Sequence, residues 1–136
     1  MLHTRDFDFS FSGLKTAVLY TIRDMKALTD DDKKKIAREF EDAAIEVLKI
    51  KTMKALKKYK AGTLIVGGGV AANAQLRKVL AQQASENNIT LYFPTKELTT
   101  DNAIMIGIAG GLQFSKAKKG VSYTSKKLKA DGNMSL

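Results

Sequence analysis

Residues 64–73 read Leu-Ile-Val-Gly-Gly-Gly-Val-Ala-Ala-Asn, and they indicate a strand, a tight turn and the start of a helix in ten residues. Its first residues are apolar strand formers, which predicts a buried strand over 63–66. The glycines of 67–69 then allow a sharp turn with positive φ and a bare backbone. Apolar residues at helical spacing predict a helix over 73–86, namely Leu76, Val79, Leu80 and Ala84. Together these features favour an anion or phosphate site, because the free amides and the dipole at a helix start attract negative charge.

The residues on either side predict further strands and helices. Phenylalanines alternate with polar residues over 7–11, which predicts a strand, and Ser12 stands where the N-cap of a following helix belongs. Thr29 and the acidic residues after it predict the capped start of a long amphipathic helix. Residues 89–93 predict another strand, and residues 103–114 predict an apolar helix that contains several small residues. The expected apolar face of the long helix consists of Ile36, Phe40, Ala43, Ala44, Val47 and Leu48.

This order of elements predicts an α/β fold in which a short mixed sheet is packed with helices. The strands are few for a complete sheet, so the sequence favours a piece of a longer protein. We expect residues 1–115 to form the folded part. Residues 116–136 are lysine-rich and patternless, which predicts a basic tail that is either flexible and solvated or an arm for RNA.

Composition narrows the class of protein. The 136 residues carry a net charge of +9, with a pI of about 9.7. Such a balance favours an anionic partner such as nucleic acid, although lysine-rich helix faces that serve only solubility explain it equally well. There is no cysteine, no apolar run long enough to span a membrane and no signal-peptide pattern, so we expect a cytoplasmic protein.

The glycine turn fits several nucleotide-binding classes only in part. Residues 67–72 satisfy the pattern GxGxxA, but the next strand ends without the acidic residue that a dinucleotide fold uses to hold a ribose. The P-loop pattern is absent. Asn73 is either a backbone cap or an amide that faces a nucleotide. Asp101, expected in the first turn of a helix, is either a dipole-stabilised carboxylate or a metal ligand.

Four segments resemble, in the correct order, signatures of the TsaD/Gcp family. They are residues 8–16 (DFSFSGLKT), 37–43 (AREFEDA), 68–77 (GGVAANAQLR) and 100–106 (TDNAIMI). The resemblance implies a partial lobe of the actin-like ATPase (ribonuclease H-like) superfamily. Members of the TsaD/Gcp family are tRNA N6-adenosine threonylcarbamoyltransferases, formerly called O-sialoglycoprotein endopeptidases or glycoproteases. They transfer threonylcarbamoyl from threonylcarbamoyl-adenylate to N6 of adenosine 37 in ANN-decoding tRNA (t6A modification).

The resemblance also implies roles for particular residues. Gly68, Gly69 and Asn73 match the segment that binds ATP or the adenylate, and Asp101 matches a ligand of the family's divalent metal, iron or zinc. The expected partners are tRNA and TsaB- and TsaE-like proteins, while TsaC makes the substrate. The family's HxxxH metal motif and its N-terminal lobe are missing here, so the isolated chain is predicted to be inactive.

Two other hypotheses remain beside that one. A non-catalytic interaction module could keep this fold and serve assembly. A dinucleotide-binding dehydrogenase would rest on the GxGxxA match alone. An exposed sheet edge and apolar surface also predict a homodimer or a higher oligomer.

Overall fold

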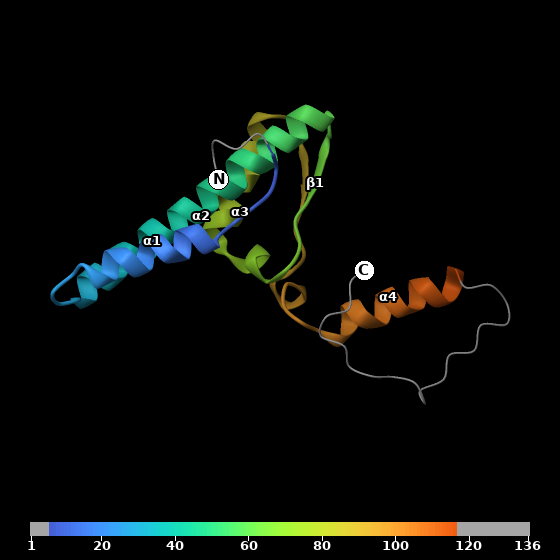
Figure 1. The fold of residues 1–136 in the computed structure, drawn as a ribbon. Helices are drawn as coiled ribbons and strands as arrows, with labels where there is room; N and C mark the ends of the chain where they lie inside the picture. The colour runs from blue at the N-terminus through green and yellow to red at the C-terminus, as the bar shows by residue number, and fades with distance from the viewer. Residues whose placement is uncertain (1–5, 117–136) are drawn as a thin grey trace. The chain divides into compact units, whose positions relative to one another are not determined.

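The computed structural model describes residues 6–116, which fall into two compact units that divide between Thr100 and Asp101. The second unit contains the helix α4 (Ala103–Lys116). The elements of the first unit are α1 (Ser12–Arg23), α2 (Asp30–Tyr59), β1 (Thr63–Ile65), the 3₁₀ helix η1 (Gly69–Ala72), α3 (Ala74–Glu86), β2 (Thr90–Tyr92) and the 3₁₀ helix η2 (Lys96–Leu98) (Figure 1).

The sheet of the described residues consists of β1 and β2, which pair in parallel with α3 as the crossover. Thr63 pairs with Thr90, and Ile65 pairs with Tyr92. Both strands and the helix between them were predicted from the sequence and are confirmed. The molecule is therefore a mixture of helix and strand, but it is mostly helical, and this sheet is parallel rather than mixed.

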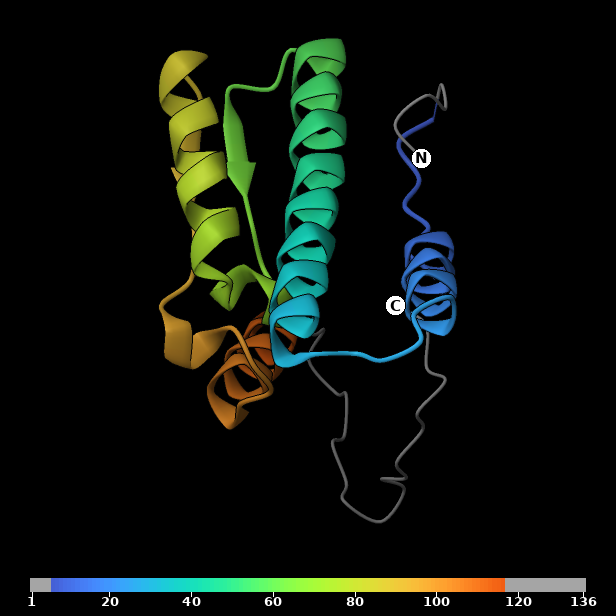
Figure 2. The same ribbon diagram turned by 90° about the vertical axis from the view of Figure 1, so that its left-hand side faces the viewer.

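The core lies where α2 and α3 cover one face of the two strands (Figures 1 and 2). Ile45 of α2 packs with Leu76 and Leu80 of α3, and all three are buried. Side chains of the helices, of β2 and of the residues that directly follow the two strands complete this cluster: Leu48, Val66, Val79, Leu91 and Phe93. On the other face, Ile65 is 77% exposed and Tyr92 is 58% exposed. Within residues 6–100, the sheet is thus covered on one side.

The predicted strand over 7–11 is wrong. This segment forms no ladder with β1 or β2; side chains anchor it to α2 instead. The Nζ atom of Lys51, whose side chain is 3% exposed, donates hydrogen bonds to Oδ1 of Asp6 (3.0 Å) and to the carbonyl oxygen of Asp8. The rings of Phe7 and Tyr59 lie 5.8 Å apart. An isolated extended segment needs a neighbouring strand to become a β-strand, and here contacts with a helix take that place.

The predicted start of α2 is confirmed, whereas that of α1 is not. Thr29 and Asp32 form a reciprocal capping box before α2. Ser12 was expected to cap α1, but it is the first helical residue, and Phe11 precedes it without a side-chain cap.

The expected apolar face of α2 is partly correct, since Val47 is buried while Phe40 is 41% exposed. All buried residues of α2 lie in its second half; besides Val47, they are Ile45, Lys51 and Leu56.

In the second unit, α4 is capped by Asn102, whose Oδ1 accepts a hydrogen bond from the backbone N–H of Met105 (2.9 Å). Lys116, the first residue of the predicted tail, is the last residue of this helix. The rest of that tail lies outside the described residues. No residue of α4 is buried, and its exposed apolar side chains are Ile104, Met105, Ile106, Ile108, Leu112 and Phe114.

No helix in the part of the chain that the structure describes is long and apolar enough to cross a membrane. Although α4 is apolar, it has 14 residues, and a bilayer requires about 20.

The capping box makes the start of α2 sensitive to acid. Hydrogen bonds from the hydroxyl and the backbone N–H of Thr29 lower the pKa of Asp32 below its ordinary 3.8. A lowered folded-state pKa gives stability that is complete above the unfolded pKa and is lost as pH falls through the folded pKa. Below about pH 4, helicity measured by circular dichroism should fall more steeply in the parent chain than in Asp32→Asn. Superimposable titrations of the two proteins would contradict this assignment.

Removing the anchor on α2 should destabilise the first unit. Lys51→Met keeps the aliphatic length but loses both charge-assisted hydrogen bonds to residues 6–8, so we expect a loss of about 1–3 kcal/mol in the free energy of unfolding. Urea denaturation of Lys51→Met and of Lys57→Met, an exposed lysine on the same helix, measures the difference. Equal midpoints for the two variants would show that the buried lysine anchors nothing.

Candidate functional site

The loop between β1 and α3 is built around a single residue with positive φ. Gly68 has φ 87°, a conformation that side-chain-bearing residues rarely adopt. Its carbonyl oxygen accepts a hydrogen bond from the N–H of Ala71 (3.0 Å), which starts the short helix η1. Gly67 and Gly69 do not have positive φ. The predicted glycine turn is therefore confirmed, with the conformational demand at its middle residue.

The glycine loop presents open backbone. A Cβ atom added at Gly67, Gly68 or Gly69 would meet no protein atom within 4 Å, and all three residues are exposed. Packing against this chain is thus no reason for glycine at 67 or 69. The bare backbone leaves room for a ligand to approach the loop closely, which is the usual advantage of glycine at such a position.

Asn73 joins this loop to two helices. Its Oδ1 accepts a hydrogen bond from the N–H of Leu76 (2.8 Å), which caps α3, and its Nδ2 donates to Oε1 of Glu41 on α2 (2.8 Å). The capping role that the sequence left open is therefore observed. A side-chain amide carries two N–H groups, so one donor remains beyond the bond to Glu41. The cap does not preclude a contact from that donor to a ligand.

The loop also lies at the start of a 13-residue helix with unused donors. The N–H of Leu76 is taken by Asn73, but those of Ala74 and Gln75 have no acceptor among the described residues. Such free amides, aligned with the positive end of the helix dipole, are the groups that bind phosphate at helix starts.

Arg77 holds the loop in place, and sequence reasoning assigned it no role. Its Nε donates to the carbonyl oxygen of Ala71 (2.5 Å), and one terminal nitrogen donates to that of Pro94 (2.7 Å). The guanidinium group also lies 4.6 Å from the centre of the Phe93 ring. These contacts connect η1 to the end of β2. The sequence feature that could have indicated this role is that Arg77 is the last residue of the signature segment 68–77.

The structure brings two of the four signature segments together. Glu41 belongs to the segment 37–43, and its contact with Asn73 places that segment beside 68–77. Arg38 lies 3.6 Å from Glu41, one turn away on α2. The carboxylate is therefore shared between a surface arginine and the amide that caps α3.

Asp101 begins the second unit, whereas Gly68, Gly69 and Asn73 belong to the first. The expectation that Asp101 lies in the first turn of a helix is wrong, because it precedes the capping residue Asn102 and is exposed. It lines an open hollow of about 520 Å³, together with residues of the first turn of α4.

The residues present do not fit a metal ion. In residues 6–116, no three His, Cys, Asp or Glu side chains gather closely enough to hold one. A single carboxylate is a poor metal site, since protein metals take three or more ligands. Asp101 therefore does not form such a centre with other described residues.

The end of β2 offers no acid for a ribose. The nearest downstream carboxylate, Glu97, lies in η2, where hydrogen bonds with its own backbone N–H and with Thr95 lower its pKa. The strand itself ends at Tyr92. The geometry thus adds nothing to the dehydrogenase hypothesis, which requires a carboxylate at the strand's end.

Comparison with known proteins identifies the family. The family described as "TsaD: tRNA N6-adenosine threonylcarbamoyltransferase" matches residues 2–108. Among curated relatives that bear this enzyme name, the chain is 46% identical to that of Paraburkholderia xenovorans (strain LB400), over 85% of this chain and 34% of the relative. It is 43% identical to that of Burkholderia thailandensis, over 93% and 39%, and 41% identical to that of Herminiimonas arsenicoxydans, over 93% and 38%.

The chain thus spans between a third and two-fifths of the length of these relatives. The matched region contains all four signature segments, and with them the glycine loop and Asp101. This chain is a member of the TsaD family.

Proposed function

We propose that this chain supplies the adenylate-binding wall of a tRNA threonylcarbamoyltransferase. The complete enzyme would transfer threonylcarbamoyl from threonylcarbamoyl-adenylate to N6 of adenosine 37 in ANN-decoding tRNA. The observation that carries the proposal is the loop 67–73, with its open glycine backbone and free amides at the start of α3, in a member of this family. In this proposal, the fold is part of an actin-like ATPase lobe.

The loop residues would bind and orient the donor. Gly68 and Gly69 let the adenylate approach the backbone, and the amides of Ala74 and Gln75 are placed to meet a phosphate. Asn73 has one N–H left for the nucleotide. Arg77 keeps the loop in position through its bonds to the carbonyl oxygens of Ala71 and Pro94. Such positioning contributes to catalysis because it makes the reaction of bound partners effectively unimolecular.

The family resemblance assigns iron or zinc to Asp101 in the complete protein, where a metal would act as a Lewis acid. The described residues bring no second ligand to it, so no step of the reaction is assigned to a metal here. The remaining ligands would come from sequence outside this chain.

The partners in this proposal are tRNA and TsaB- and TsaE-like proteins, in the cytoplasm. Because the chain spans 34–39% of its relatives, the rest of the enzyme is needed to complete the cleft. The exposed apolar side chains of α4 and the uncovered face of the sheet also support self-association of the isolated chain.

A second candidate is a non-catalytic interaction module. The unburied α4 favours it, because an apolar helix with no buried residue is a surface suited to contact with another protein. The two candidates differ in nucleotide binding, which only the transferase requires.

The proposal predicts that a methyl group at Gly69 blocks the nucleotide. Gly69→Ala requires no positive φ and meets no protein atom, so the fold should persist. Isothermal titration with ATP should show at least about tenfold weaker binding, which is about 1.4 kcal/mol. Gly62→Ala, whose added Cβ also meets no protein atom, is the matched control. Equal affinities of these variants, or no binding by the parent chain at millimolar ATP, would count against the adenylate site.

The isolated chain is predicted to be inactive. Incubated with tRNA, threonylcarbamoyl-adenylate, a divalent metal and TsaB- and TsaE-like proteins, it should form no modified adenosine, because one carboxylate cannot hold the metal tightly. Mass spectrometry of digested tRNA measures the product, and a complete family member run in parallel shows that the assay works. Product formed by the chain alone would overturn this prediction.

A further inference from the structure

The second half of α2 carries an excess of positive charge. No Asp or Glu occurs between Glu46 and Glu86. The cations in that interval are Lys49, Lys51, Lys54, Lys57, Lys58, Lys60, Arg77 and Lys78. Lys54, Lys57 and Lys58 are exposed and lie three and four residues apart, so they share one side of the helix.

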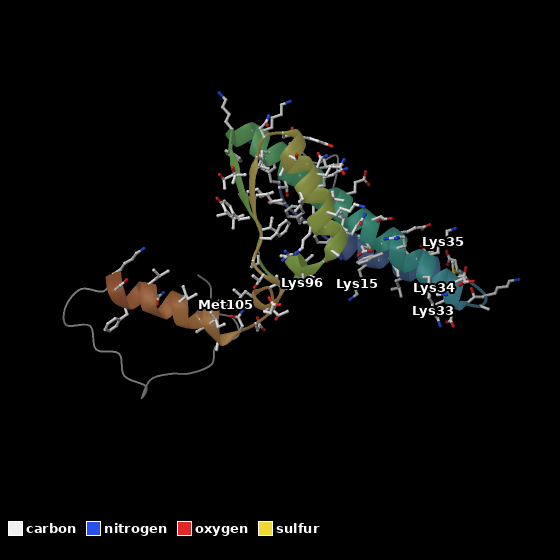
Figure 3. The ribbon with its side chains drawn as sticks, turned by 180° about the vertical axis from the view of Figure 1, so that it is seen from behind. Lys15, Lys33, Lys34, Lys35, Lys96 and Met105 are labelled. Atoms are coloured by element: carbon white, nitrogen blue, oxygen red, sulfur yellow. The ribbon has the colours of Figure 1, made fainter. Side chains whose placement is uncertain are left out.

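These charges differ from those at the other end of the same helix. There, Lys33 and Lys34, labelled in Figure 3, pair with Asp30 (2.8 Å) and Asp31 (3.0 Å). Lys57 and Lys58 have no carboxylate partner among the described residues. The start of α2 is therefore locally neutral, whereas its end retains uncompensated positive charge. Ordinary solubility does not require that asymmetry.

Aromatic rings lie directly beside two lysines of this end of α2, Lys54 and Lys58. Nζ of Lys58 is 5.0 Å from the ring centre of Phe7 and 5.5 Å from that of Tyr59. Nζ of Lys54 is 5.9 Å from the ring centre of Phe7. Tyr59 is 68% exposed, so a face of this cluster is open to solvent. Exposed aromatic rings with lysines beside them are a combination that binds nucleic acid, because bases stack on aromatic rings while phosphates contact the cations.

The same rings line an apolar pocket of about 250 Å³, which is walled by Phe7, Phe9, Leu56, Tyr59 and Leu64. Pockets for drug-sized ligands begin at about 300 Å³, so this one suits a smaller flat group such as a single base. The buried Lys51 fixes one side of this pocket. Its hydrogen bonds to Asp6 and to the carbonyl oxygen of Asp8 hold the segment that carries Phe7 and Phe9 against α2. The site is thus anchored by a buried side chain.

We propose that this surface, formed by Phe7, Lys54, Lys57, Lys58 and Tyr59, binds an unpaired stretch of RNA. A base stacks on Phe7 and Tyr59, and the flanking phosphates contact the lysines. The surface lies at the start of β1, whereas the loop 67–73 follows the end of that strand. The proposal extends the proposed function and rests on it for the choice of RNA as the partner. It assigns unpaired RNA because bases within a duplex do not expose their faces to aromatic side chains.

The test compares two double variants that remove equal charge from one helix. Lys57→Gln/Lys58→Gln should weaken binding of a fluorescein-labelled single-stranded RNA about tenfold or more, measured by anisotropy. It should also reduce the slope of log K against log salt by about 1.4, since each phosphate contact contributes about 0.7. Lys33→Gln/Lys34→Gln should leave both quantities unchanged. An equal effect of the two double variants would overturn the proposal, because it would show that net charge alone attracts RNA.

A third variant separates stacking from charge. Tyr59→Ala should weaken binding about five- to hundredfold with the salt slope unchanged, whereas Tyr59→Phe should retain affinity. No loss in Tyr59→Ala, or a duplex of equal length that binds as tightly as the single strand, would overturn the stacking role. Equal competition by polyglutamate would overturn the choice of RNA. Circular dichroism of each variant confirms that α2 is intact.

The outcome is distinguishable from a failure of the proposed function. ATP binding is measured on Gly69→Ala, and RNA binding on the lysine and tyrosine variants without nucleotide. Loss of the RNA result with ATP binding intact would reject this surface alone. ATP binding that fails while the RNA results hold would reject the adenylate site and leave the RNA surface supported.

Discussion

The side-chain amide of Asn73 is the interaction on which the first unit depends. Its oxygen satisfies the first turn of α3, and its nitrogen reaches Glu41 on α2. The helix that it caps then presents Leu76 and Leu80 to Ile45, so the cap sets the direction of the element that buries the core. Burial of such side chains contributes about 1.5–3 kcal/mol each. The helix that Asn73 caps therefore contributes more to stability than the hydrogen bonds of the cap alone.

The glycine loop and the aromatic segment beside the basic end of α2 are held in place by the same kind of contact. The loop is open because Gly67, Gly68 and Gly69 meet no protein atom, and it stays ordered because Arg77 bonds to Ala71 and Pro94. At the opposite end of β1, Lys51 fixes the aromatic segment to α2 in a comparable way. In both places, a long cationic side chain reaches backbone carbonyls and leaves neighbouring groups available for a ligand.

Local signals predicted the fold where the physics is local. The capping box at Thr29, the strands at 63–66 and 89–93 and the cap at Asn73 depend on residues a few positions apart, and each was found as expected. The strand at 7–11 was not, although its alternation is regular. Alternation marks an extended segment with two faces, but a strand also requires a neighbour at hydrogen-bonding distance, which sequence spacing cannot supply.

Short segments of the sequence were enough to identify the family, the starts of α2 and α3 and the residue types of the glycine loop, because motif order, caps and glycine content are local properties. The tertiary structure was needed to show that Asn73 bonds to Glu41, that Arg77 links η1 to Pro94 beyond β2, and that Lys51 is buried against residues 6–8. The bonds of Asn73 to Glu41, of Arg77 to Pro94 and of Lys51 to Asp6 join residues between 17 and 45 positions apart. Their partners are chosen by how α2, α3 and the strands pack, and that packing is a property of the whole unit rather than of any one segment.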